Sequence, residues 1–145
     1  MHLVIENSKP IRAAAAYIRL SVFVIERHIA LEDEFDDTDS DQEIYAVCFD
    51  GRTPAATCRF EKVAPQTLKI GQVATLKQYR HQGLGTKVLT AMETYAIEHH
   101  YKQSVIHSEV TAKDFYEHLG YHIASEIFIE DGVPCVNMKK SLESH

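Results

Sequence analysis

Two glycines stand between a predicted buried strand and the longest amphipathic helix of this sequence. The strand covers about residues 68–76 and the helix residues 83–100, with Gly83 and Gly85 where the helix begins. The first N–H groups of a helix have no partner inside it and carry partial positive charge, so they can bind an anion. Glycine has no Cβ to obstruct a phosphate, and Arg80 can add a charge-assisted hydrogen bond. The junction therefore predicts a strand, a tight turn and a helix around an anion site.

The two common nucleotide-binding loops do not fit this junction. A P-loop needs Lys and then Ser or Thr directly after its last glycine, whereas Thr86 follows Gly85. A dinucleotide-binding loop needs a third glycine where this chain has Val88. Taken alone, the two glycines are explained equally well by an ordinary tight turn.

The rest of the hydrophobic pattern predicts one mixed α/β domain over residues 1–145. The strongest hairpin signal is Asp50-Gly51 between two apolar runs. An alanine-rich stretch predicts a helix over residues 11–27, with Arg19 and Arg27 on its polar side. Further segments fit strands at 3–5, 44–49, 55–60, 68–76, 104–108, 121–129 and 133–138, and a short helix at 111–119. This order favours a sheet with helices packed on its faces.

The acidity of the chain is local. Of 145 residues, 45% are hydrophobic and 25% charged, which is typical of a globular domain, and the net charge is −6. Eight of the twelve residues from 32 to 43 are acidic, and the other 13 acidic residues stand against 15 basic ones. The remainder of the chain thus carries +2. No basic stripe suits a phosphate backbone, so no nucleic-acid partner is expected.

Neither a membrane span nor a metal centre is predicted. The apolar stretch at 13–25 is interrupted by Arg19 and is shorter than the roughly 20 residues of a membrane helix. The N-terminus lacks the basic start and apolar run of a secretory signal, so a cytoplasmic protein is expected. Cys48, Cys58 and Cys135 lie apart in apolar runs, which predicts reduced, buried thiols and no metal-ligand cluster.

Two motifs resemble those of the GNAT acetyltransferases. The spacing Arg80-x-x-Gly83-x-Gly85 is similar to the family's acetyl-CoA pyrophosphate motif, and residues 112–121 resemble its late helix. Phe23-Val24-Ile25-Glu26, with the acidic segment, resembles the small bacterial ElaA-like branch. The resemblance covers essentially the whole chain. It implies a mixed α/β fold with a central, mostly antiparallel, splayed sheet of about six to seven strands and helices on both faces.

The resemblance also implies a binding site for acetyl-CoA as cosubstrate. Backbone amides of residues 82–86 would hold the pyrophosphate, with Arg80 nearby. The main chain of residues 73–75 would pair with the pantetheine arm, and an amide there would stabilise the developing oxyanion. The residues implied in cofactor binding are Val73, Ala74, Thr75, Arg80, His81, Gln82, Gly83, Leu84, Gly85 and Thr86.

Tyr116, in the second motif, would be the general acid that protonates the leaving thiolate, with a buried core tyrosine as the alternative reading. The general base is not singled out by the sequence. Glu26 and Glu34 lead, because the segment after the first long helix commonly forms the acceptor wall in the family. Asp36 belongs with them, and the lesser candidates are His28, His107 and Glu109. Arg59, on an apolar strand, would either orient an anionic acceptor or pair with a carboxylate of the acidic segment.

Two functions remain open at this point. The first is transfer of an acetyl group to a primary amine, small molecule or peptide, by direct attack in a ternary complex. The second is a non-catalytic module of the same fold that senses acyl-CoA. The acidic segment would attract a cationic amine. Asp37-x-Asp39-x-Asp41 begins like a calcium loop, but Gln42 and Cys48 stand where Gly and Glu are required. The strand ending at Met138 would leave a sheet edge for a homodimer.

Overall fold

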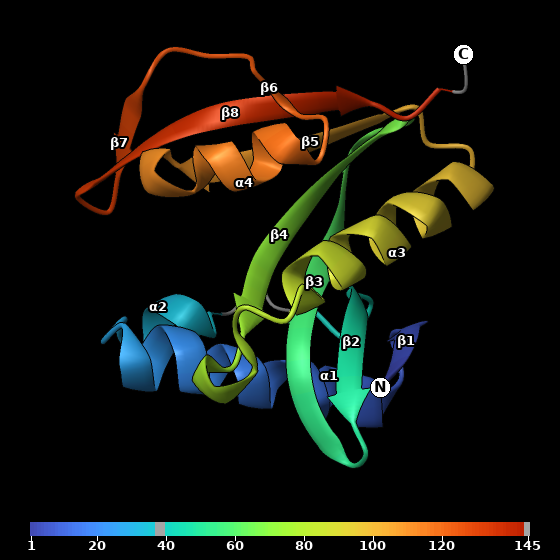
Figure 1. Ribbon diagram of the computed structural model, residues 1–145, viewed down its shortest axis with the longest axis vertical. Helices are drawn as coiled ribbons and strands as arrows, with labels where there is room; N and C mark the ends of the chain where they lie inside the picture. The colour runs from blue at the N-terminus through green and yellow to red at the C-terminus, as the bar shows by residue number, and fades with distance from the viewer. Residues whose placement is uncertain (37–39, 144–145) are drawn as a thin grey trace.

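The computed structural model describes residues 1–36 and 40–143, which form a strongly twisted sheet flanked by helices (Figure 1). The strands are β1 (His2–Glu6), β2 (Ile44–Asp50), β3 (Thr53–Ala64), β4 (Thr67–Thr75), β5 (Gln103–Glu109), β6 (His122–Ile123), β7 (Phe128–Glu130) and β8 (Val133–Ser141). The α-helices are α1 (Lys9–Arg19), α2 (Leu31–Glu34), α3 (Leu84–Glu98) and α4 (Lys113–His118). A π-helix, η1 (Leu20–Glu26), and two 3-10 turns, η2 (Lys77–Tyr79) and η3 (Val110–Ala112), complete the elements.

Within the described residues the sheet has eight strands in the order β1-β2-β3-β4-β5-β8-β6, with β7 also paired to β8. Of these strands, only β4 and β5 pair in parallel. The mixed, mostly antiparallel fold is confirmed, and the strand number is higher than expected because residues 121–129 form two short strands. Between them, Ser125 Oγ accepts the N–H of Asn137, so this segment leaves the ladder.

The C-terminal strand is not a sheet edge. β8 pairs with β5 on one side and with β6 and β7 on the other. The expectation that residues up to Met138 leave an edge for a second copy is therefore wrong. β1 ends the sheet on one side, and a homodimer through such an edge stays a prediction.

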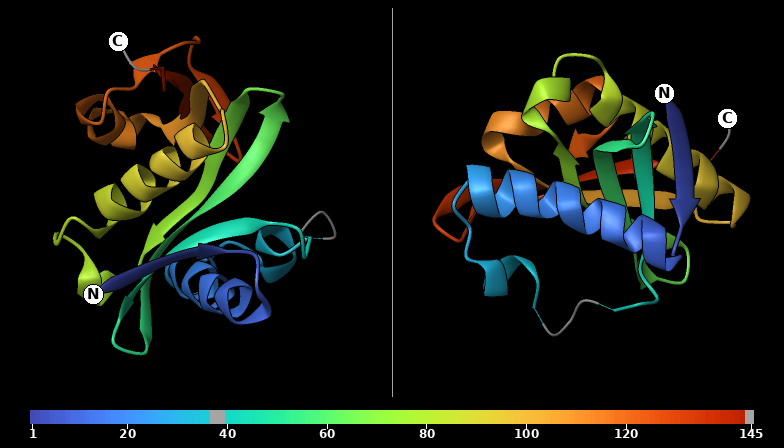
Figure 2. Two further views of the ribbon diagram at one scale, coloured as in Figure 1. Left: turned by 90° about the vertical axis from the view of Figure 1, so that its right-hand side faces the viewer. Right: turned by 90° about the horizontal axis from the view of Figure 1, so that it is seen from below.

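α1 and α3 lie on opposite faces of β2, β3 and β4 (Figure 2), and one apolar core packs under each helix. Side chains alternate between faces along a strand, so Tyr45 and Val47 of β2 pack toward α1, while Ala46 and Cys48 pack toward α3. The helices thus cover both faces, as expected. None of the helices within the described residues is long and apolar enough to cross a membrane.

The first long helix departs from its predicted form at Arg19. The α-helix ends there and continues as η1, where the Ser21 hydroxyl donates to the Tyr17 carbonyl at 2.8 Å and three β-branched residues follow. Arg19 was expected on the polar side but is only 2% exposed. Its Nε donates to Glu34 Oε2 at 2.8 Å and its Nη1 to the Tyr45 hydroxyl at 2.8 Å. A buried carboxylate, rather than solvent, therefore balances this charge.

Candidate active site

A β-bulge opens the sheet beside the predicted site. In the β3–β4 ladder, Gln72 and Val73 together stand opposite the single residue Cys58. Gln72 has a left-handed φ of 51°, a conformation that bends a bulged strand. The parallel pairing of β4 with β5 ends at Lys69 and Val105. Beyond these residues β4 runs away from β5 and β8, which leaves a wedge between the two halves of the sheet (Figure 1).

The turn before α3 has the form that the glycines predict. Gly83 is the N-cap with φ 77°, and none of the side chains that the structure describes caps the helix. A Cβ at Gly83 would meet no atom of the described residues within 4 Å, so an incoming group can approach the backbone there. His81, with φ 66°, is also left-handed, which is uncommon for a residue with a side chain. Uncapped amides beside an open glycine suit an anion such as a pyrophosphate.

A cleft of about 830 Å³ lies against this turn; we call it the loop cleft. Its walls come from β4, the start of α3, η1 and the residues around α4. The structure brings nearly all the implied cofactor residues to this one cleft, and of the ten only Gln82 is not in its lining. The implied residues in the lining are Val73, Ala74, Thr75, Arg80, His81, Gly83, Leu84, Gly85 and Thr86.

Glu26 holds Arg80 at the edge of the loop cleft. Arg80 Nη1 and Nη2 donate to the two carboxylate oxygens of Glu26 at 2.6 and 2.8 Å, and its Nε donates to the Thr75 carbonyl at 3.1 Å. The hydrogen bond from Arg80 lowers the pKa of Glu26. A carboxylate with a lowered pKa is a weaker base, so this geometry favours Glu26 as the partner that positions Arg80.

A second cavity, of about 210 Å³, lies where β4 and β5 separate; we call it the β4–β5 cavity. It shares Phe23, Arg27, Val73 and Ala112 with the loop cleft, so the two spaces adjoin at the bulge. Tyr116 lines the β4–β5 cavity. A molecule anchored at the start of α3 and extended along β4 would therefore reach the neighbourhood of this phenol.

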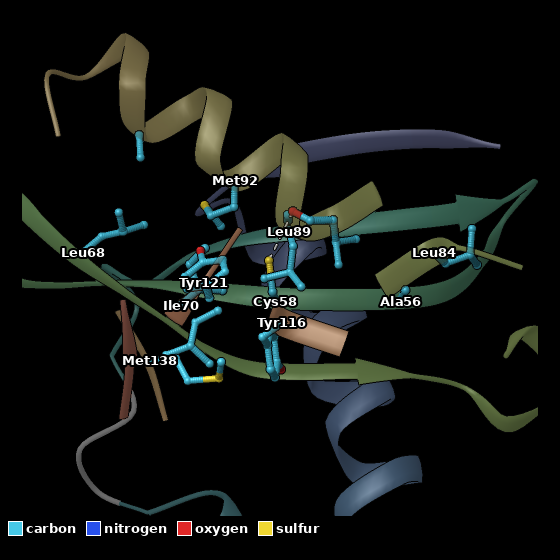
Figure 3. Packing of buried hydrophobic residues seen from close by; sticks show 14 of the residues in the cluster. Ala56, Cys58, Leu68, Ile70, Leu84, Leu89, Met92, Tyr116, Tyr121 and Met138 are labelled. Carbon is cyan, nitrogen blue, oxygen red and sulfur yellow. Dashed lines mark hydrogen bonds between the residues drawn. The ribbon is translucent and has the colours of Figure 1, made fainter. Parts of the chain in front are cut away.

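Tyr116 is both a core residue and a cavity residue. It is 8% exposed, and it packs in the cluster of Figure 3 with its ring edge-on to Tyr121 at 6.2 Å. Burial, with smaller contributions from the nearby Cys58 and Glu109, raises the pKa of Tyr116 to about 12. The phenol consequently stays protonated at neutral pH and can donate a hydrogen bond.

The cavity also holds groups to which sequence reasoning gave little weight. Arg27 was expected only on the polar side of a helix, but its Nη2 lies 2.6 Å from Glu109 Oε1 across the wedge. His107 lines the same cavity, and burial lowers the pKa of its ring. Gln72, on the bulge, was missed altogether, because no local pattern marks a bulge in an apolar strand. No sequence signal marks the end of η1 either, although this ending places Arg27 in the lining of the cavity.

Most of the described acidic residues of the segment from 32 to 43 are exposed, as a solvated loop requires, and two of its carboxylates pair with arginines. Glu34 is buried against Arg19 and lines neither the loop cleft nor the β4–β5 cavity. Glu43 lies 2.8 Å from Arg59, so Arg59 pairs with a carboxylate of this segment, one of its two expected roles. Asp37 and Asp39 of the calcium-like pattern lie outside the described residues. Within residues 1–36 and 40–143, no group of three His, Cys, Asp or Glu side chains could hold a metal ion.

The chain matches known acetyltransferases along most of its length. Residues 19–142 match the model of the acetyltransferase (GNAT) domain. An uncharacterized acetyltransferase of Streptococcus pyogenes is 36% identical over 112 residues, which is 77% of each chain. The crystal structure of a putative N-acetyltransferase from Lactobacillus plantarum is 40% identical, with a TM-score of 0.94 over 98% of each chain. Escherichia coli ElaA shares the fold at 20% identity, with a TM-score of 0.82 over 96% of this chain and 98% of its own. This chain therefore belongs to the GNAT acetyltransferase family.

Proposed function

We propose that this protein transfers the acetyl group of acetyl-CoA to a primary amine, by direct attack while both substrates are bound, in the cytoplasm. The observation that carries the proposal is the junction at the β4 bulge. There the loop cleft, with its uncapped helix amides, adjoins the cavity that contains Tyr116. One side of the junction suits a pyrophosphate and the other suits proton transfer, as a reaction between a CoA thioester and an amine requires.

The residues at the site fit acetyl-CoA. The amides at the start of α3 and the open backbone at Gly83 would hold the pyrophosphate, and Arg80 would reach it by leaving Glu26. The edge of β4 from Val73 to Thr75, which β5 does not pair, would hold the pantetheine arm. When bound, acetyl-CoA supplies a thioester whose carbonyl carbon is the electrophile. An amide of the bulge would stabilise negative charge on the carbonyl oxygen.

Two side chains of the β4–β5 cavity would move the protons. A bond forms between the amine nitrogen and the acetyl carbon, and the carbon–sulfur bond breaks. The nitrogen loses one proton, which we assign to the neutral ring of His107, because the lowered pKa of this ring leaves it free to accept at neutral pH. The sulfur gains one proton from Tyr116, which the raised pKa keeps protonated until charge develops on sulfur. Solvent then returns the proton to Tyr116 and removes the one on His107.

A sensor that binds acyl-CoA without turnover is the second candidate. The loop cleft by itself would serve both functions, since it holds only the cofactor end. The position of Tyr116 favours catalysis, because a sensor has no use for a phenol that faces the reacting end of the ligand.

Thiol release from acetyl-CoA, measured against a panel of primary amines, tests the proposal when calorimetry reports binding separately. We expect Tyr116→Phe to bind acetyl-CoA as the wild type does and to lower kcat by about 10²-fold or more, the usual contribution of a positioned acid. Tyr101→Phe, which removes a phenol that lies outside both spaces, should change neither quantity. Binding without turnover would favour the sensor, and an absence of binding would refute both functions.

A further inference from the structure

Arg27 and Glu109 form an ion pair that faces the β4–β5 cavity. Arg27 Nη2 lies 2.6 Å from Glu109 Oε1, and the two side chains are 43% and 33% exposed. Exposed pairs of this kind stabilise a fold little, because water screens the charges in either state. The fold does not depend on this pair, so a ligand can separate the two groups at small cost.

The backbone fixes each member of the pair independently of the other. Arg27 ends η1, where its N–H donates to the Val22 carbonyl at 3.1 Å. Glu109 ends β5, where it pairs with Cys135 of β8. Only the side chains would have to turn for a ligand to enter between them. The entering molecule would then meet a guanidinium on one side and a carboxylate on the other.

The remaining lining places this charge pair next to the reacting groups. The same cavity contains the bulge residues Gln72 and Val73, together with His107 and Tyr116. At about 210 Å³ it has room for roughly seven water molecules, and hence for a small organic molecule of similar size. An ammonium held by Glu109 would lie in the same cavity as the ring that we assign as proton acceptor.

From these contacts we infer that the acceptor is a small zwitterion, a primary amine that also bears a carboxylate, as α-amino acids do. Arg27 binds the carboxylate through its planar fork of N–H donors, and Glu109 binds the ammonium. The ammonium gives one proton to solvent before the neutral amine attacks, and the nitrogen then passes its second proton to His107. The inference rests on the proposed function and adds the class of acceptor. It also explains why a cation and an anion line one cavity, which an acceptor with a single positive charge would not require.

The test compares amino acids with their amides, which keep the amine and lose the negative charge. L-alanine, L-serine and L-threonine are each measured against the corresponding amide by thiol release, and the N-acetyl product is identified by mass spectrometry. We expect kcat/KM for the acids to exceed that for the amides by about tenfold or more, the factor of one charge-assisted hydrogen bond. Arg27→Gln should remove this preference by raising KM for the acids alone, and Arg27→Lys should restore part of it.

Arg27 also lines the loop cleft, so acetyl-CoA affinity is measured by calorimetry for every variant. Arg52→Gln, at an exposed arginine of the β2–β3 turn, is the matched control and should keep the preference. Amides that react as well as the acids, or an acid preference unchanged in Arg27→Gln, would overturn the inference. So would a protein that binds acetyl-CoA but acetylates none of the acids. Failure to bind acetyl-CoA at all would instead refute the proposed function.

Discussion

His107 and Tyr116 face one cavity but ionise in opposite pH ranges. The pKa of His107 is lowered from its usual value of 6.5, so the ring becomes protonated, and loses its capacity as a base, only as the pH falls below that value. We expect kcat to rise with pH through this pKa and then to stay level up to about pH 10, because Tyr116 remains protonated there.

His107→Gln should lower kcat by about 10²-fold and remove the acidic limb of the pH profile. His122→Gln, at an exposed histidine of β6, should leave the limb in place. Rates of acetyl transfer measured from about pH 5 to 10 decide the point. An acidic limb that persists in His107→Gln would assign the base to another group.

The bidentate pair between Glu26 and Arg80 predicts that Glu26 positions Arg80 and is not the general base. Glu26→Gln should leave kcat within about threefold of the wild type and tighten acetyl-CoA binding, because Arg80 no longer has to leave a carboxylate. Calorimetry and initial rates measure the two effects, with Glu32→Gln as a control at an exposed carboxylate of α2. A loss of kcat with unchanged affinity would return Glu26 to the role of general base.

The same pair predicts how stability depends on pH. Arg80 lowers the pKa of Glu26 in the folded protein, so the pair stabilises the fold above the carboxylate's unfolded pKa, about 4.3. That stabilisation is lost as the pH falls through the folded pKa. Both side chains are about one-third exposed, so the effect is small: wild type should unfold at a slightly higher urea concentration than Glu26→Gln at pH 7, and at the same concentration once Glu26 is protonated. A difference that persists in acid would contradict this account.

At the scale of elements, the regular helices and strands could be predicted from the sequence, whereas the irregular turns and bulges within them could not. The Asp50-Gly51 hairpin and the helix that begins after Gly83 have local signals, and both form. The π-helix after Arg19 and the bulge at Gln72 depend on packing between distant segments, so no short window contains them. The glycine turn before α3 was accordingly predicted from sequence, whereas the β4–β5 cavity, which η1 and the bulge help to form, was not.

The bulge can be tested at Gln72, whose φ of 51° disfavours a β-branched side chain. Gln72→Val should destabilise the protein by about 1–2 kcal/mol and weaken acetyl-CoA binding, because valine opposes the left-handed turn that separates β4 from β5. Gln72→Gly, which accepts that φ without strain, is the matched control and should unfold at or above the wild-type midpoint. Urea titration and calorimetry give both quantities. Equal stability of the two variants would show that the bulge does not need this conformation.

At the scale of the whole molecule, one largely buried network joins α3, which follows the glycine turn, to the part of the fold that holds Tyr116. Glu93 of α3 accepts a hydrogen bond from the Tyr121 hydroxyl at 2.7 Å and pairs with Lys140 of β8 at 2.9 Å. Lys140 also donates to the Leu119 carbonyl at 2.7 Å, at the end of α4. The wedge can stay open at the bulge because this network and the short β4–β5 pairing close it at the other end.

Glu93 is 8% exposed, so removal of either charge leaves the other poorly solvated. We expect Glu93→Leu and Lys140→Met each to lower the free energy of unfolding by about 2–3 kcal/mol, and the double variant to lower it by less than their sum. The reason is that each single variant leaves one charge without its partner, whereas the double variant leaves none. Urea titration of the four proteins measures the coupling, and kcat reports whether α4 still positions Tyr116. Additive losses would mean that Glu93 and Lys140 do not act as a pair. Apolar packing, and not this network, would then hold the two halves together and set the width of the wedge.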